Sequence, residues 1–144
     1  MSYKGIYKPS YPEKYLGDFK NIVYRSLWER KFMVYCDTNE NILKWASEEI
    51  YIPYISPLDN RIHKYFPDFY IKYKDTNNNI KESLVEIKPK RQVNGPNLNK
   101  RVTKKQMYET LEFAKNQAKW KAAEEFCEDR RWSFQILTED NLGI

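Results

Sequence analysis

The spacing of apolar residues predicts one helix early in the chain. Trp28, Phe32 and Cys36 recur every four residues, which places them on one face of a helix. Ser26 and Glu29 have the residue types and spacing of a capping box, so the helix should begin at Ser26. Because a polar run follows Cys36 directly, we expect the helix to end there.

Strands are expected further along, where β-branched and aromatic residues alternate with polar ones. The predicted strands cover residues 42–45, 50–55, 65–73, 80–88 and 132–137, with a polar loop at 56–64 and a turn at 74–79. After Pro89 and a loop through residues 94–97, a long helical region is predicted from a stripe of apolar residues: Met107, Leu111, Ala114, Ala118, Trp120, Ala123 and Cys127. The order helix, β-meander, helices, strand predicts an α/β domain with a mixed β-sheet flanked by helices.

The first 22 residues read as a basic, tyrosine-rich arm, followed by a single domain at 23–144. Tyrosine and lysine interleave along this arm, which is compatible with two arrangements. The tyrosines could stack on nucleic acid while the lysines contact phosphates. Alternatively, the segment lies across the core with its lysines in solvent. The pattern favours the second arrangement.

Composition limits the class of protein. With 144 residues, 41% hydrophobic and 31% charged, the chain is long enough for one globular domain with a proper core. We expect neither a secretory signal nor a membrane span, because no long apolar run is present. Two cysteines and one histidine are too few for a structural zinc site, and they fit a cytoplasmic protein with reduced thiols. The net charge of +5 indicates a polyanionic partner only if the charge lies near a site.

The candidate chemistry lies on the predicted hairpin around Asn77. Asp68 and Glu86 are equally far from Asn77 in sequence, so a regular hairpin places them opposite each other, with Cβ atoms about 5 Å apart. Lys88 shares the face of Glu86 because strand side chains alternate. Two such carboxylates repel by roughly 3 kcal/mol. A Mg²⁺ ion, for which Mn²⁺ can substitute, would offset that repulsion.

A solvated hairpin face could carry the same three residues without any catalytic role. However, Asp68 follows Pro67 in an aromatic run, and Glu86 lies in an apolar run. Carboxylates in such runs are expected to be partly buried, where unpaired charge is costly, and this favours a catalytic interpretation. Glu29, judged by its spacing alone, is a structural capping residue.

Residues 26–32, 65–69 and 85–89 together resemble the PD-(D/E)xK nuclease superfamily. Within it, the chain resembles the N-terminal domain of TnsA-like transposon endonucleases and, more closely, the head completion nucleases of T4-like tailed bacteriophages. The second resemblance extends through residues 119–123 and 136–140, and so covers nearly the whole chain. It implies a core like that of restriction endonucleases.

The resemblance also implies roles for individual residues. Asp68 and Glu86 would be the metal ligands, with the Ile87 carbonyl, and Lys88 would be the catalytic lysine. Glu29 would be the acid of the first helix, able to join the metal site. TnsA-like enzymes often have Gln at the position of Glu86, so the carboxylate here is the more ordinary superfamily version.

The implied function is metal-dependent hydrolysis of double-stranded DNA during virion assembly, so that filled heads can join tails. Endonuclease and exonuclease action both stay open. The implied partners are phage head or portal proteins, and the implied location is the cytoplasm of an infected bacterium, with retention in the virion left open. One alternative is a transposon endonuclease subunit that cuts only with partner proteins, against which the lack of a C-terminal partner-binding domain counts. A second is a non-catalytic, DNA-binding head–tail adaptor, against which the intact set of four residues counts.

Basic residues near these motifs are candidate DNA contacts. Several cluster where the long helical region begins, although cations there oppose the helix macrodipole, and this favours a phosphate-binding role over an ordinary solvated patch. The predicted DNA-binding residues are Arg25, Lys90, Arg91, Lys100, Arg101, Lys104 and Lys105. His63 is expected to be an exposed loop residue, and Trp45, Trp120 and Trp132 are expected in the core.

Overall fold

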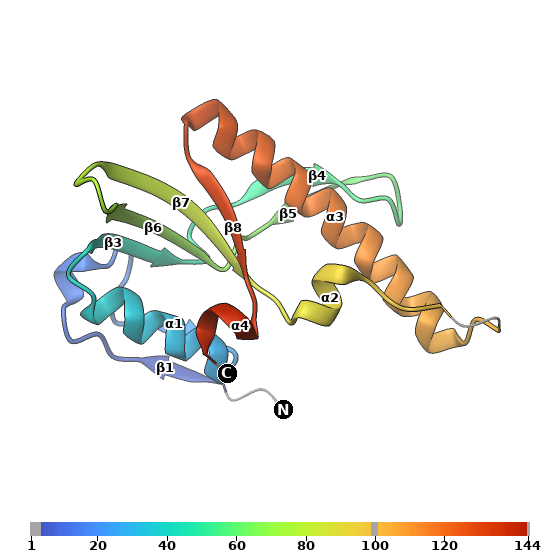
Figure 1. The fold of residues 1–144 in the computed structure, drawn as a ribbon, viewed down its shortest axis with the longest axis horizontal. Coiled ribbons are helices and arrows are strands. Elements are labelled where there is room, and N and C mark those ends of the chain that lie inside the picture. Colours follow the sequence, from blue (N-terminus) through green and yellow to red (C-terminus); the bar gives the residue numbers. More distant parts are fainter. Residues whose placement is uncertain (1–3, 99–100, 144) are drawn as a thin grey trace.

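The computed structural model describes residues 4–98 and 101–143 (Figure 1). Its elements are, in chain order, β1 (Gly5–Tyr7), the 3₁₀ turn η1 (Pro12–Lys14), β2 (Ile22–Tyr24), α1 (Leu27–Thr38), β3 (Ile42–Ser47), β4 (Ile52–Ile55), β5 (Ile62–Tyr65), β6 (Phe69–Lys74), β7 (Ile80–Ile87), α2 (Lys90–Asn94), α3 (Lys104–Arg130), β8 (Ser133–Leu137) and α4 (Glu139–Leu142). None of the described helices combines the length and the apolar character needed to cross a lipid bilayer.

A four-stranded sheet in the order β3-β6-β7-β8 forms the centre of the fold. Strand β7 runs antiparallel to β6 and parallel to β8, so the sheet is mixed. Helix α1 lies against one face and α3 against the other, as Figure 1 shows. The predicted mixed sheet flanked by helices is therefore confirmed.

Strand β7 is buried on both faces because its side chains alternate between two hydrophobic cores. Val85 and Ile87 lie in the first core, with residues of α1 such as Phe32. Leu84 lies in the second core, with Trp120 of α3. A strand covered on both sides is expected to be apolar in its buried part, which explains the apolar residues Leu84, Val85 and Ile87 before Lys88.

Helix α1 begins as predicted but forms only half of the expected capping box. The Ser26 hydroxyl accepts a hydrogen bond from the Glu29 N–H at 3.1 Å. The Glu29 carboxylate accepts from the N–H of Arg25, at 3.3 Å, and from the Ser26 hydroxyl, at 3.5 Å, rather than from the Ser26 N–H. The helix also continues through Asp37 to Thr38, past the predicted end.

Asp37 is buried in the last turn of α1, where three groups of the N-terminal segment donate hydrogen bonds to its carboxylate. The Tyr7 hydroxyl and the N–H of Ser10 each lie 2.7 Å from Oδ2, and the N–H of Tyr11 lies 2.9 Å from Oδ1. The Lys14 ammonium group caps the same end of α1 by donating to three backbone carbonyls.

The aromatic residues of this segment point in different directions. Tyr7 and Tyr15 are buried in the first core, whereas Tyr11 is half exposed. Strand β1 pairs with β2, so the segment is tied to the chain beyond residue 22. The division into an arm at 1–22 and a domain at 23–144 stays a prediction.

A separate hairpin corrects the predicted strands. Residues 62–64, expected in a loop, pair with β4 as the start of β5. The single strand predicted at 65–73 is divided into β5 and β6 around Pro67, which has no N–H to donate to a ladder. His63 is exposed as expected, but it stands in β5 and pairs with Asp59 at 2.7 Å. The loop prediction failed because exposed strands lack the alternation of buried ones.

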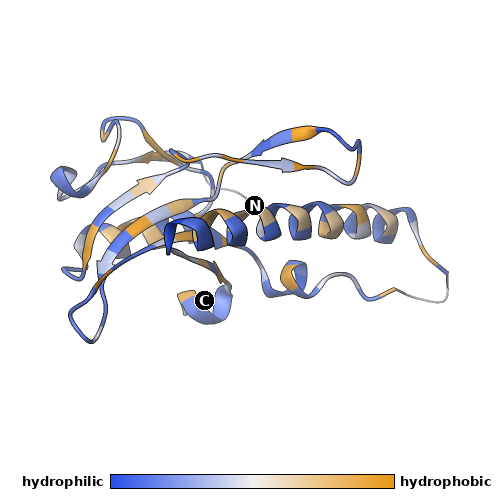
Figure 2. Ribbon diagram, turned by 90° about the horizontal axis from the view of Figure 1, so that it is seen from above, coloured by the Kyte–Doolittle hydropathy of each residue, from blue (hydrophilic) through white to orange (hydrophobic). Residues whose placement is uncertain are grey.

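Helix α3 is about 40 Å long and its first half extends beyond the sheet (Figures 1 and 2). The helix predicted from the apolar stripe is therefore present, but Met107 and Leu111 of that stripe are 57% and 52% exposed. Helical spacing identifies a face but does not show what covers it. Further along, Trp120 is buried as predicted, as is Trp45 in β3, and Trp132 is partly buried. The short helices α2 and α4 were not predicted.

Candidate active site

The β6–β7 hairpin has the predicted register. Phe69 pairs with Val85 in the antiparallel ladder, so the next position brings Asp68 beside Glu86. The register is fixed by the turn, where Asp75 Oδ1 accepts from the N–H groups of Asn77 and Asn79 at 2.9 Å each. A defined turn sets the pairing of every residue along the two strands.

Backbone hydrogen bonds hold the two acidic residues together. The Asp68 N–H donates to Glu86 Oε1 at 3.3 Å, and the Ile87 N–H donates to Asp68 Oδ2 at 2.7 Å. The Asp68 carbonyl accepts from the Glu48 N–H at 3.1 Å. Both carboxyl groups are thus positioned by peptide groups and do not depend on flexible side-chain partners.

Burial makes this pair electrostatically unfavourable when both members are ionised. Glu86 is 5% exposed, and burial raises its pKa, while the charge of Lys88 acts in the opposite direction. Burial and then the negative charge of Glu86 raise the pKa of Asp68 well above its usual value. The Lys88 ammonium lies 4.0 Å from Glu86 Oε2, which offsets only part of the repulsion. A further cation would relieve it.

The oxygen donors present fit a magnesium ion better than a softer metal. Across residues 4–98 and 101–143, no group of three or more Asp, Glu, His and Cys side chains is gathered closely enough to hold a metal alone. A pair of carboxylates is nevertheless what Mg²⁺ uses at sites where water and a substrate phosphate complete its coordination. The donor set therefore suits a site that is completed by substrate.

Glu29 reaches the same neighbourhood from the first turn of α1. Its charge is close enough to raise the pKa of Asp68. Burial is the main cause that raises the pKa of Glu29 itself, and the charge of Glu48 adds to it. Arg25 forms an ion pair with Glu48 and its charge also acts on Glu29 and Asp68. The structure therefore brings Glu29 and Arg25 to the pair on the hairpin.

Tyr65 and Lys119 also belong to this neighbourhood, although no sequence pattern indicated them. Burial raises the pKa of Tyr65, and so do the charge and the side chain of the neighbouring Glu86. The Lys119 ammonium lies 5.6 Å from the centre of the Tyr65 ring. Burial lowers the pKa of Lys119, as do the like charges of Lys115 and Lys88. These residues were missed because they come together only through packing of α3 on the hairpin β4–β5.

The predicted DNA-binding residues fall into separate groups. Lys90 and Arg91 begin α2 directly after the candidate site, and Lys90 also pairs with Asp140 at 3.2 Å. Arg101, Lys104 and Lys105 are exposed around the start of α3. The length of the helix puts that start about 20 Å from Lys119. Lys100 lies outside the described residues.

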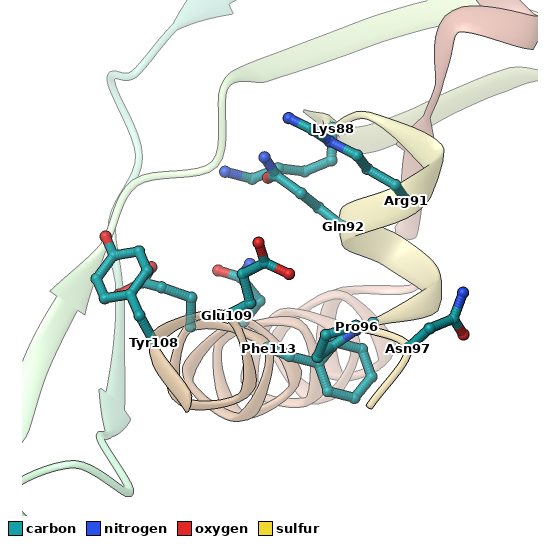
Figure 3. Close-up of a pocket in the computed structure, with 11 residues that line it drawn as sticks. Lys88, Arg91, Gln92, Pro96, Asn97, Tyr108, Glu109 and Phe113 are labelled. Carbon is teal, nitrogen blue, oxygen red and sulfur yellow. The ribbon is translucent and has the colours of Figure 1, made fainter. Parts of the chain in front are cut away.

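A cleft of about 340 Å³ opens beside Lys88, between α2 and α3 (Figure 3). Lys88 and Arg91 line it from one side, and Glu109 and Glu112 line it from α3. No sequence pattern indicated this cleft, because the acidic residues of α3 are far in sequence from the hairpin.

Comparison with known proteins agrees with this architecture. Residues 39–139 match the family model described as TnsA-like endonuclease N terminal, a range that contains Asp68, Glu86 and Lys88 but not Glu29. The chain is 38% identical over 146 residues to the head completion nuclease of Enterobacteria phage T4, across 99% of this chain and 95% of that protein. No solved structure matches the chain. The resemblance seen in the sequence is thus confirmed: the chain belongs to the TnsA-like endonuclease family, and its mixed, helix-flanked sheet is the PD-(D/E)xK nuclease fold.

Proposed function

We propose that the protein is a Mg²⁺-dependent deoxyribonuclease of phage head completion, with Mn²⁺ able to replace Mg²⁺. The observation that carries the proposal is the buried Asp68–Glu86 pair, which peptide groups fix beside Lys88. The similarity to a head completion nuclease over nearly the whole chain supports the biological role.

Asp68, Glu86 and the Ile87 carbonyl would hold the metal, and Glu29, whose charge raises the pKa of Asp68, would join the site through a bound water molecule. Bound there, Mg²⁺ would offset negative charge on the phosphate and lower the pKa of a water molecule. The donor chemistry supports this assignment, because hard carboxylate and carbonyl oxygens are the ligands Mg²⁺ prefers.

The side chains of Lys88 and Glu29 supply the rest of the proposed mechanism. Lys88 donates from its ammonium group to the scissile phosphate or to the attacking water, and so stabilises the charge that develops in the transition state. Glu29 would accept a hydrogen bond from water at its carboxylate, which the Arg25 N–H and the Ser26 hydroxyl hold in place. Hydrolysis adds the water oxygen to phosphorus and releases one DNA strand end as an alcohol.

Double-stranded DNA is the proposed partner. Lys90 and Arg91 would contact phosphates close to the cleaved bond, and Arg25 would do so from the other side of the site. The second group, Arg101, Lys104 and Lys105, would contact phosphates about 20 Å away, which is about six phosphates along one strand. Lys100 stays a predicted DNA contact. The enzyme would cut within strands and also at their ends, and act in the cytoplasm of the infected bacterium beside head or portal proteins.

A partner-dependent endonuclease is the second candidate, because the matching family model is the N-terminal part of TnsA-like endonucleases. Under that alternative, the protein would bind DNA but cut it only when a second protein is present.

The test is incubation of the purified protein with supercoiled plasmid and Mg²⁺. Loss of nicking both in EDTA and in Lys88→Ala, with retention in Lys121→Ala on the exposed side of α3, supports the proposal. Nicking that persists in Lys88→Ala contradicts it. An intact plasmid together with tight, salt-sensitive DNA binding supports the partner-dependent alternative.

A further inference from the structure

The cleft between α2 and α3 begins at the candidate catalytic lysine. Lys88 forms part of its wall, so whatever occupies the cleft lies next to the phosphate that Lys88 contacts. In Figure 3, Lys88, Arg91 and Gln92 extend from the α2 side, and Glu109 points toward them from α3. Tyr108 and Phe113 stand on α3 at the two edges of this space.

The end of the cleft away from Lys88 is formed by close packing of the loop after α2 on α3. Gly95 has a positive φ of 85°, and a Cβ atom there would lie 3.1 Å from the ring of Phe113. The loop after α2 is therefore seated directly on α3. Asn116, which is buried, adds an amide group to the lining. The cleft is thus a feature of the folded structure and not a gap between unrelated surface side chains.

Charge divides the cleft into two halves. Lys88 and Arg91 supply cations on one side. Glu109 and Glu112 supply carboxylates on the other, and Glu112 keeps its position through Lys115 at 3.1 Å. A DNA phosphate is attracted to the first half and repelled by the second. Glu109 and Glu112 are paired with lysines of α3, so the repulsion is reduced. The second half of the cleft is still less favourable for a phosphate than for an uncharged group attached to one.

We propose that this cleft binds the base of an unpaired nucleotide adjoining the cleaved phosphate, an inference that rests on the proposed nuclease function. The phosphate of that nucleotide lies toward Lys88 and Arg91. Its base stacks on Tyr108 or Phe113, since aromatic side chains bind unpaired bases in a sequence-tolerant way. A volume of about 340 Å³ is at the lower end of the range for sites that enclose a small molecule.

The carboxylates add a preference among bases. Ionised Glu109 and Glu112 can accept hydrogen bonds but cannot donate them. Cytosine, adenine and guanine carry an exocyclic amino group that can donate, whereas unpaired thymine has only its ring N3–H as a donor. In paired DNA that amino group is already engaged, so the preference applies to single-stranded ends, overhangs and unpaired stretches.

The test measures binding in EDTA, with no cleavage, to one duplex that ends in three unpaired cytosines, in three unpaired thymines, or blunt. The wild-type protein is expected to bind the cytosine overhang on the order of tenfold more tightly than the thymine overhang. The blunt duplex is expected to bind more weakly than either. Free dCMP as a competitor separates recognition of the nucleotide alone from recognition of a strand end.

The double variant Glu109→Ala and Glu112→Ala sharpens the test, because both residues lie on a solvent-facing part of α3 where alanine favours the helix. Loss of two negative charges should tighten binding to every DNA, yet abolish the cytosine preference. Glu125→Ala, exposed further along the same helix, should keep that preference. Equal binding of both overhangs by the wild type, or a preference that survives in the double variant, overturns the proposal.

Plasmid nicking measured on the same preparations separates this proposal from the nuclease function. If the protein nicks plasmid but shows no cytosine preference, the proposed base site is disproved and the proposed nuclease function is retained. A cytosine preference that depends on Glu109 and Glu112, without nicking under any condition, leaves a nucleotide-binding cleft and removes the catalytic assignment.

Discussion

The N–H of Asp68 donates to the carboxylate of Glu86, so the peptide group of one acidic residue positions the side chain of the other. Asp68 immediately precedes β6 and Glu86 lies in β7, yet backbone N–H groups donate to both carboxyls. This arrangement makes the site rigid before any metal or DNA is bound, and it leads to the following predictions.

Replacement of Glu86 by alanine should abolish cleavage while the fold survives. The side chain is one of two proposed metal ligands, so we expect plasmid nicking to fall by at least about 100-fold. The substitution also removes a buried carboxyl whose charge is only partly compensated. The free energy of unfolding, measured in urea, should therefore change by no more than about 2 kcal/mol. Glu124→Ala, exposed on α3, is the matched control. Retained nicking would remove Glu86 from the mechanism.

The stability of the metal-free protein should fall as the pH rises. Burial and the neighbouring Glu86 charge raise the pKa of Asp68, so the folded state binds its proton more tightly than the unfolded state does. The stabilisation from this bound proton is fully present below about pH 4, the pKa of Asp68 in the unfolded chain. It is lost as the pH rises through the higher pKa of Asp68 in the folded protein.

Thermal unfolding in EDTA between about pH 5 and pH 8 measures this effect. Asp68→Asn cannot ionise, so its Tm should fall less steeply with pH than that of the wild type. Asp129→Asn, which is exposed, should follow the wild type. Parallel curves for wild type and Asp68→Asn would show that Asp68 does not carry the pH dependence.

Added Mg²⁺ should stabilise the folded protein, because the ion binds a site that the unfolded chain lacks. With a Kd of about 1 mM, a tenfold excess contributes about 1.4 kcal/mol, or a rise in Tm of about 3–5 °C. The rise should be absent in Glu86→Gln, which loses a charged ligand without losing volume. An equal rise in both proteins would place the ion elsewhere.

Glu29→Gln should separate catalysis from helix capping. Glutamine can still accept the hydrogen bond from Arg25, so stability should change by less than about 1 kcal/mol. Cleavage should fall about 10- to 100-fold, because the carboxylate charge beside Asp68 is gone. Unchanged cleavage would assign Glu29 the structural role that its spacing alone suggests. Glu40→Gln, exposed after α1, is the control.

Asp37→Asn should destabilise the protein without touching the candidate site. The fully buried carboxylate accepts three hydrogen bonds from the N-terminal segment, and an amide cannot accept all three. We expect a loss of about 2–4 kcal/mol in urea unfolding. Cleavage by the remaining folded protein should be normal. A loss below about 0.5 kcal/mol would show that the segment contributes little to stability.

The part of the site that lies on one hairpin could be predicted from sequence. The turn around Asn77 fixes the register, and alternation then determines which side chains share a face, so Asp68, Glu86 and Lys88 follow from counting. Glu29 depends on how α1 packs against that hairpin, which spacing does not encode. Its catalytic role was suggested by resemblance alone and stays a prediction.

The remaining features depend on contacts between distant segments. Tyr65 and Lys119 meet because α3 packs on the second hairpin, and the α2–α3 cleft has the same origin. The exposure of Met107 and Leu111 has a related cause. Their spacing correctly predicts a helix face, but the sheet ends before that part of α3, so the face is left in solvent.

Strand β7 contributes alternate residues to both hydrophobic cores. Neither core can open without losing one of its walls, so the two should unfold as a single cooperative unit. Amide hydrogens in β7 should exchange at a rate set by global unfolding, while the first turns of α3, which lack a covering sheet, exchange through local fraying. A form in which one core has unfolded while Asp68 and Glu86 stay in place is therefore not expected, and inactivation by heat or urea should coincide with loss of both cores.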